Sequence, residues 1–247
     1  MTLDREAFKR LCADESVSRS AEGGIGVYCE KRLHRILKRV VYEDTSAHEV
    51  KVGKSVADVF DGRVITEIQT GSFYPIRDKI EYYLRETEYK VILIHPVIAD
   101  KRIIRADKES GEVIRIRRSP KRIGVGEIMR EVAYLGELVK NDRLEIVVLY
   151  ISADEYRYSE AMRYRREGRY DSELFPREII SEESFCGTRS YAFLLDGMPE
   201  RFSAKEYGQH SGMKGRELYA TLKLLCALGL LERERQGKAY EDRRAEK

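Results

Sequence analysis

Cysteine is scarce in this sequence, and long apolar runs are absent from it. The four cysteines are scattered along the chain: Cys12, Cys29, Cys186 and Cys226. They form no C-x-x-C pair, which argues against a disulfide framework and against a zinc site and is typical of intracellular thiols. The longest apolar run, 91–99, is interrupted by His95 and Pro96 and is far too short to span a bilayer. With no apolar secretory segment at the N-terminus, we expect a cytoplasmic protein that does not enter a membrane.

A strong excess of either charge is also missing. The 247 residues include 46 Lys and Arg and 43 Asp and Glu, which gives a net charge of +3. Attraction of the whole protein to nucleic acid is therefore weak, and any surface of that kind must be local. The length allows one large domain or two ordinary ones.

The most informative stretch is 56–69, which reads as two short strands joined by a tight turn. Asp61-Gly62 lies between apolar runs, and this dipeptide favours a two-residue type I′ turn with positive φ at both positions. Such a turn fixes the register of the two strands, and side chains alternate between the faces of a strand. We therefore expect Asp58, Glu67 and Gln69 on one polar face, with the apolar side chains on the other face, in the core.

Asp58 and Glu67 are candidate ligands of a divalent cation. Their diagonal positions bring the two Cβ atoms within roughly 8 Å, a distance that two carboxylates can span with a cation between them. Upstream, Glu30 lies on the apolar side of the helix expected over 26–38, where a carboxylate is costly unless it is paired, coordinated or solvated. His34, one turn later, can point the same way. The alternatives are the wet face of an ordinary hairpin and a surface pair between Glu30 and His34.

These elements follow one another in a specific order. A helix that bears Glu30 comes first. Three strands are expected next, at 39–42, around Asp58 and at Glu67-x-Gln69. A helix at about 74–86 and an apolar strand at 91–94 follow. This α-β-β-β-α-β order, with Asp58 followed by Glu67-Ile68-Gln69, resembles the core of the PD-(D/E)XK (restriction-endonuclease-like) nuclease superfamily, in the variant where Gln replaces the final Lys. The resemblance covers about residues 20–105.

The resemblance implies a role for each of these residues. Asp58 and Glu67 would bind Mg²⁺ or Mn²⁺, Gln69 would position water, and Glu30 would be an accessory ligand or a base relay. A neutral Gln can orient water by hydrogen bonds, but it cannot carry the positive charge of Lys toward the phosphate.

The missing cation has to come from another residue. The helix after the motif offers Arg77 and Lys79, and some Glu-x-Gln branches of the superfamily keep a basic residue at about this place. We take Lys79 as the catalytic cation and Arg77 as a contact to nucleic acid. The alternative is that Lys79 pairs with neighbouring acids on a solvated face.

A second hairpin is expected over 102–117, with a polar turn in its middle. Its alternation puts Arg115 and Arg117 on one face. The loop that follows carries Lys121 and Arg122, and next to a phosphodiester site this basic loop would guide a nucleic-acid backbone. The alternative for the loop is a solubilising turn.

A helix at 127–138 and a buried strand at 144–150 are expected to close a first domain, 1–152. The rest of the chain, 153–247, begins with a segment in which five arginines interleave with four tyrosines. Arg pairs with phosphate and Tyr stacks on bases, so this mixture suits nucleic acid. The candidate contacts are Arg163, Arg165 and Arg166. The alternative is an interdomain segment whose Tyr rings pack while the Arg head groups stay in water.

The C-terminal part, 200–242, carries clear helix signals. Ser203 and Glu206 form a capping-box pattern at the start of a helix, and a longer helix at 216–228 ends at Gly229. Two short strands joined by a turn follow. The succession of helix, turn, longer helix and two-stranded wing resembles a winged helix-turn-helix module.

In winged helices that bind DNA, the second helix enters the major groove. The resemblance would therefore place Lys214 and Arg216 near DNA. The wing is rich in acids, which favours the alternative that this module binds a protein partner, forms a homodimer or packs on the neighbouring domain.

The predicted fold class is α/β (α+β): a restriction-endonuclease-like mixed sheet flanked by helices, plus a smaller C-terminal winged-helix domain. The predicted function is a metal-dependent nuclease that hydrolyses phosphodiester bonds of nucleic acid, with DNA favoured. The alternative is a non-catalytic DNA- or protein-binding regulator or scaffold with a degenerate nuclease fold. Retention of Glu30, Asp58 and Glu67 together favours the nuclease, because decay would free all three to drift.

Overall fold

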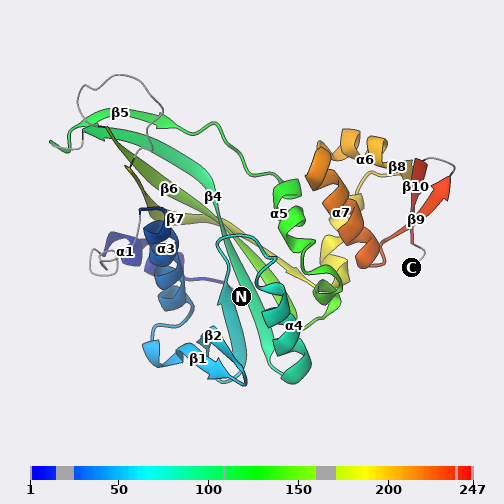
Figure 1. The fold of residues 1–247 in the computed structure, drawn as a ribbon, viewed down its shortest axis with the longest axis horizontal. Helices are drawn as coiled ribbons and strands as arrows, with labels where there is room; N and C mark the ends of the chain where they lie inside the picture. The colour runs from blue at the N-terminus through cyan, green and yellow to red at the C-terminus, as the bar shows by residue number, and fades with distance from the viewer. Residues whose placement is uncertain (1, 15–24, 108–109, 160–170, 237–238, 246–247) are drawn as a thin grey trace. The chain divides into compact units, whose positions relative to one another are not determined.

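The computed structural model describes residues 2–14, 25–107, 110–159, 171–236 and 239–245. These residues form a mixed α/β protein with a large sheet flanked by helices (Figure 1). The strands of this sheet are β1 (His48–Val52), β2 (Ser55–Phe60), β3 (Val64–Ile68), β4 (Lys90–Asp107), β5 (Val113–Arg118), β6 (Leu144–Ser159) and β7 (Asp171–Cys186).

The helices that precede or interrupt these strands are α1 (Arg5–Ala13), α3 (Ile25–Val41), α4 (Arg77–Glu86) and α5 (Val125–Val132), with short 3-10 helices η1 (Thr45–Ala47) and η2 (Gly136–Lys140). After β7 come η3 (Thr188–Leu195), β8 (Arg201–Ser203), α6 (Ala204–Ser211), α7 (Gly215–Ala227), β9 (Leu231–Gln236) and β10 (Ala239–Arg244). No helix of the described residues is both long and apolar enough to cross a membrane.

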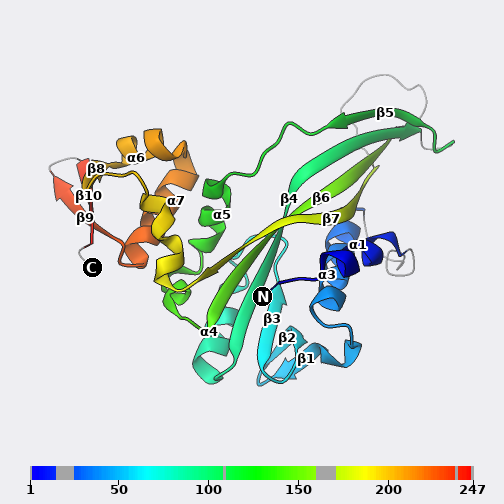
Figure 2. The same cartoon turned by 180° about the vertical axis from the view of Figure 1, so that it is seen from behind.

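The strand order of the large sheet is β1-β2-β3-β4-β6-β7, with β5 paired to β4 outside this path (Figure 2). The expected α-β-β-β-α-β order is therefore present, with one correction. The strand predicted at 39–42 is wrong, because α3 continues to Val41 and the first strand is β1. The apolar spacing of Leu33, Ile36 and Leu37, all buried, extends the helix through the β-branched pair at its end.

The connection between β2 and β3 also differs from the prediction. β2 ends at Phe60 and β3 begins at Val64, so three residues link them. Gly62 has a φ of 88°, but Asp61 is not among the residues with positive φ, as a type I′ turn would require. The predicted two-residue turn is therefore wrong, and the register derived from it has no support.

The predicted division into a core face and a polar face holds for β2, where Ala57 and Val59 are buried and Asp58 between them is partly exposed, but it is wrong for β3. Ile65, Thr66, Glu67 and Ile68 are consecutive and all buried. Because consecutive side chains point to opposite faces, β3 is buried on both sides. β2 and β4 pair with its two edges, so β3 is an interior strand of the sheet.

The second predicted hairpin is confirmed. β4 and β5 pair antiparallel, with Arg102 opposite Arg118 and Arg105 opposite Arg115. β4 is much longer than the expected apolar strand, because it continues without a break from the buried stretch 91–97 into this hairpin.

The chain divides into two compact units, each made of three segments. The first comprises 1–61, 94–122 and 148–183, and the second comprises 62–93, 123–147 and 184–247. The boundary expected at residue 152 lies inside β6, and β7 belongs to the same sheet. Residue 152 therefore does not separate one element from the next.

The C-terminal elements belong to the second unit. The capping box is present: the Ser203 hydroxyl accepts from the Glu206 amide, and the Glu206 carboxylate accepts from the Ser203 amide. β8, β10 and β9 form a three-stranded sheet beside α6 and α7. α7 packs on α5 at close range, since a Cβ added to Gly126 would lie 2.8 Å from Glu217 Oε2.

Candidate functional site

Glu67 is a buried carboxylate in β3 with two donors from α4. Its side chain is 1% exposed. Lys79 Nζ donates to Glu67 Oε2 at 2.7 Å, and the Tyr83 hydroxyl donates to Oε1 at 3.2 Å. Lys79 and Tyr83 are one helical turn apart, so the same face of α4 presents both groups to the strand. Tyr83 was not predicted, although its four-residue spacing from Lys79 was the signal that could have identified it.

The contacts with Lys79 and Tyr83 compensate for the burial of the Glu67 carboxylate. An ionised carboxylate is costly to bury unless it is paired and hydrogen-bonded, and here both oxygens accept a hydrogen bond. Lys79 keeps 29% of its side chain exposed, which leaves its ammonium partly in water. Lys79 thus pairs with a buried acid of the predicted site, not with acids on a solvated face. Its catalytic role stays a prediction.

Gln69 lies directly after β3, in the exposed connection to α4. Its Nε2 donates to the Ser72 carbonyl at 2.7 Å. This contact uses one of the two hydrogens of the amide nitrogen to hold the loop. The role of Gln69 in positioning water stays a prediction.

Asp58 has a histidine partner. His34 Nε2 and Asp58 Oδ2 are hydrogen-bonded at 2.9 Å, between α3 and β2. His34 therefore reaches the strand that carries the predicted metal ligand, an arrangement that helical spacing alone did not reveal. A carboxylate at one ring nitrogen fixes the orientation of an imidazole, as it does for bases and metal ligands.

One turn later along α3, Lys38 contacts Glu49 of β1, with 2.9 Å between Nζ and Oε1. Lys38 is buried, and its hydrogen bond and positive charge hold the pKa of the Glu49 carboxyl below its usual value. Glu49 has a φ of 54°, the left-handed region that residues other than glycine rarely adopt. Such a conformation costs about 1 kcal/mol and persists where neighbouring contacts enforce it.

The side chains that are available as metal ligands indicate which metal ion the chain could bind. Among the described residues, no group of three or more His, Cys, Asp or Glu is placed to bind a metal ion. Mg²⁺ needs fewer protein ligands, because one or two carboxylates with water and substrate phosphate complete its shell. Asp58 and Glu67 fit that requirement by their chemistry. They belong to different compact units, so their pairing stays a prediction.

Several predicted residues lie outside the part of the chain that can be described. The backbone of Glu30 belongs to α3, but its side chain is outside the described residues, and so are Arg163, Arg165 and Arg166. Their predicted roles are neither supported nor contradicted.

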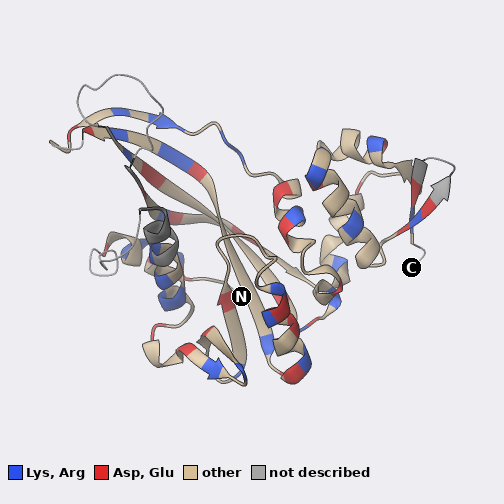
Figure 3. Ribbon diagram, viewed as in Figure 1, with Lys and Arg blue, Asp and Glu red and all other residues tan. Residues whose placement is uncertain are grey.

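The remaining predicted basic residues lie at the surface. Arg77 is within 3.8 Å of Asp78 and of Glu81 on α4, so its charge is locally balanced. Four others are exposed: Arg115 and Arg117 on β5, and Lys121 and Arg122 in the loop after it. Figure 3 shows Lys and Arg along β5 and this loop. Lys214, the N-cap of α7, and Arg216 are exposed too.

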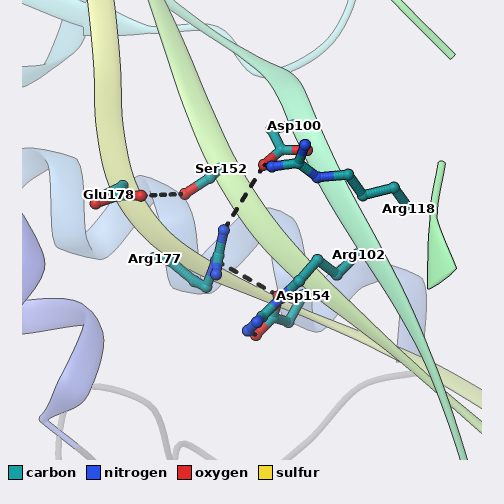
Figure 4. A network of polar contacts seen from close by, with 7 residues as sticks. All are labelled: Asp100, Arg102, Arg118, Ser152, Asp154, Arg177 and Glu178. Atoms are coloured by element: carbon teal, nitrogen blue, oxygen red, sulfur yellow. Dashed lines mark hydrogen bonds and ion pairs between the residues drawn. The ribbon is translucent and has the colours of Figure 1, made fainter. Parts of the chain in front are cut away.

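A polar network joins β4, β5, β6 and β7 in the first unit (Figure 4). Arg102 donates to the buried Asp154 at 2.7 Å, and Arg177 lies 3.4 Å from the same carboxylate. Arg118 donates to Asp100 at 3.2 Å. No sequence pattern indicated this network, because its members come together only when distant strands pair.

A protein of Treponema pallidum (strain Nichols), described as uncharacterized, is 29% identical over 186 residues, which cover 73% of this chain and 72% of the relative. No solved structure matches significantly. The model of one family, described as a domain of unknown function, DUF8091, matches residues 31–186. Since that match covers more than half of the chain and ends where β7 ends, the chain belongs to the DUF8091 family.

Proposed function

We propose that the protein is a metal-dependent nuclease that hydrolyses phosphodiester bonds, with DNA as the favoured substrate. The observation that carries the proposal is the buried Glu67 carboxylate with the Lys79 ammonium 2.7 Å away. A restriction-endonuclease-like core of the Glu-x-Gln type needs a carboxylate at this point and a cation from another residue. The order α3-β1-β2-β3-α4-β4 supports the same proposal.

Each residue then has a defined task. Bound Mg²⁺ or Mn²⁺ would polarise the phosphate and lower the pKa of a coordinated water. Glu67 and Asp58 would supply oxygen ligands for it, and the hydrogen bond with His34 would orient the Asp58 carboxylate. Lys79 stabilises negative charge that develops on the phosphate, a task that the neutral Gln69 cannot perform.

The C-terminal elements support a role in recruiting DNA. The order α6, α7, β9, β10 supports a winged helix-turn-helix module, in which α7 would be the recognition helix. Beyond Lys214, the exposed side chains of α7 include Arg216, Tyr219 and Lys223, which are spaced for one face of the helix. Positive charge with an aromatic ring suits contact with a nucleic-acid backbone and bases.

One observation favours the second candidate, a non-catalytic regulator or scaffold. Both oxygens of Glu67 already accept hydrogen bonds from protein groups. A carboxylate satisfied in this way is able to serve as a structural ion pair that joins α4 to β3, with no metal involved. In that case the winged helix-turn-helix-like part would carry the function.

Cleavage assays with a matched variant separate the two candidates. Purified protein is incubated with labelled single- and double-stranded DNA and RNA in Mg²⁺, Mn²⁺ or chelator. We expect hydrolysis only with the cation, and its loss, together with loss of Mn²⁺ binding, in Glu67→Gln. Glu81→Gln, which removes an exposed carboxylate from α4, should cleave normally. Absence of cleavage on every substrate, or cleavage that persists in chelator, would contradict the proposal.

A further inference from the structure

The β4–β5 hairpin carries a cluster of arginines on one face. Arg105 is directly opposite Arg115, and Ile103 is opposite Arg117. Because side chains two residues apart share a face, these four side chains point the same way. They line a hollow of about 250 Å³.

The two faces of this hairpin balance their charges differently. On the other face, Arg102 pairs with Asp154 and Arg118 pairs with Asp100, as Figure 4 shows. Arg115 and Arg117 form no ion pair with any carboxylate in the described part of the chain. One face is therefore neutralised by neighbouring strands, whereas no carboxylate of the described residues balances Arg115 and Arg117.

Such an arrangement is unfavourable for the protein alone. Like charges directly opposite each other on neighbouring strands destabilise a sheet. Here Arg105 and Arg115 occupy opposed positions, and Arg117 is only about 7 Å further along β5. A bound anion removes this repulsion, and the planar guanidinium groups match the geometry of phosphate oxygens.

We propose that this hollow is a binding site for phosphate groups, supplied by the backbone of a nucleic-acid strand. Its volume of about 250 Å³ is below the roughly 300 to 1,000 Å³ of pockets that enclose whole small molecules. A phosphate group fits such a space while the rest of the ligand stays outside. The choice of nucleic acid as the source of the phosphate rests on the proposed function, whereas the anion site itself does not.

Binding of labelled oligonucleotides to the full chain, in chelator so that no cleavage occurs, tests the proposal. We expect each of Arg115→Gln and Arg117→Gln to weaken binding roughly tenfold at low salt. The double variant should also lower the slope of log affinity against log salt by about 2. The matched control is Arg85→Gln, which removes an exposed arginine that has its own carboxylate partner and should bind as the native protein does.

Two further measurements keep the result decisive. Arg115→Gln should unfold at the same or a higher urea concentration than the native protein, because it breaks no ion pair with a described carboxylate and relieves the repulsion with Arg117; a large destabilisation would overturn the proposal. Inorganic tripolyphosphate distinguishes the sources of phosphate. If the two variants weaken tripolyphosphate binding but leave oligonucleotide binding unchanged, the nucleic-acid source is overturned. If the variants change neither, the anion site is overturned. Loss of oligonucleotide binding in the variants supports the proposal even where the protein cleaves no substrate.

Discussion

At the scale of single residues, the candidate site consists of carboxylates that are held by side chains from helices. Glu67 is held by Lys79 and Tyr83 of α4, and Asp58 by His34 of α3. In both cases a strand supplies the carboxylate and a helix supplies the partner. Helical spacing shows which side chains share a face, but it does not show which strand that face will meet.

The two donors to Glu67 should contribute unequally to stability. Tyr83→Phe removes one hydrogen bond and keeps the buried ring, so we expect a loss of about 1 kcal/mol in the free energy of unfolding. Lys79→Met leaves a buried carboxylate without its counter-charge. Its cost should be larger, about 2 kcal/mol, reduced from the value for a fully buried pair because Lys79 is partly exposed.

Urea unfolding of the two variants at neutral pH measures this difference. Arg85→Gln, at an exposed position of the same helix, should change stability by less than about 0.5 kcal/mol and serves as the control. If Lys79→Met were as stable as the native protein, the ion pair would make no net contribution.

The pair between Lys38 and Glu49 predicts a dependence of stability on pH. The pKa of Glu49 is lowered in the folded chain, so this pair stabilises the fold above the unfolded value, about 4.3, and the stabilisation is lost as pH falls through the folded value. Glu49→Gln should therefore be less stable than the native protein at pH 7. The two should converge toward pH 3.

Urea midpoints measured from pH 3 to pH 7 test this expectation. Glu137→Gln, which removes an exposed carboxylate that is 3.5 Å from Lys140, is the matched control. A difference between Glu49→Gln and the native protein that stays constant over this range would show that the charge of Glu49 does not matter.

At the scale of elements, local signals succeeded where the partners are close in sequence. The capping box at Ser203 and the left-handed residue Gly229 after α7 are both present where the sequence placed them. The β4–β5 pairing was also predicted, because two alternating runs around a polar turn specify their own register. These features need no information about the rest of the fold.

The cap of α6 should be a measurable part of its stability. Ser203→Ala removes the acceptor for the Glu206 amide and should cost about 1 kcal/mol of unfolding free energy. Ser203→Asp keeps a capping oxygen, so it should stay close to the native protein. Chemical unfolding followed by circular dichroism compares the two variants. Equal losses in both would mean that the position contributes through packing and not through the cap.

At the scale of the whole molecule, the order of the elements was predicted from the sequence more accurately than the burial of their side chains and their contacts with distant strands. The α-β-β-β-α-β order and the mixed α/β class are present. The strand at 39–42 and the turn at 61–62 were wrong because β-branched residues and an Asp-Gly pair are local preferences that packing overrides. The network around Asp154 depends on β6 and β7, which lie far from β4 in the sequence. No local pattern encodes these contacts.

The same long-range pairing decides where the chain can be cut. A chain that ends at residue 152 loses the end of β6 and the whole of β7, and with them Asp154 and Arg177 of the polar network. A chain that ends at residue 186 keeps the seven strands but loses α7. Ile128, Met129 and Val132 of α5 are buried, and α7 packs on this helix. Uncovering half of three such side chains costs about 3 kcal/mol, a large part of the usual stability of a domain.

We therefore expect neither shortened chain to behave as an independent domain. The chain 1–152 should lack a cooperative urea transition, and the chain 1–186 should unfold at a lower urea concentration than the full chain. The apolar surface of α5 that is exposed in the chain 1–186 should make this shortened chain bind a hydrophobic dye. Met129→Ala in the full chain is a useful comparison, because it weakens the core at α5 without removing α7. If the chain 1–186 unfolded cooperatively at the midpoint of the full chain, the packing of α7 on α5 would contribute nothing to the rest of the fold, and the C-terminal part would be separable after all.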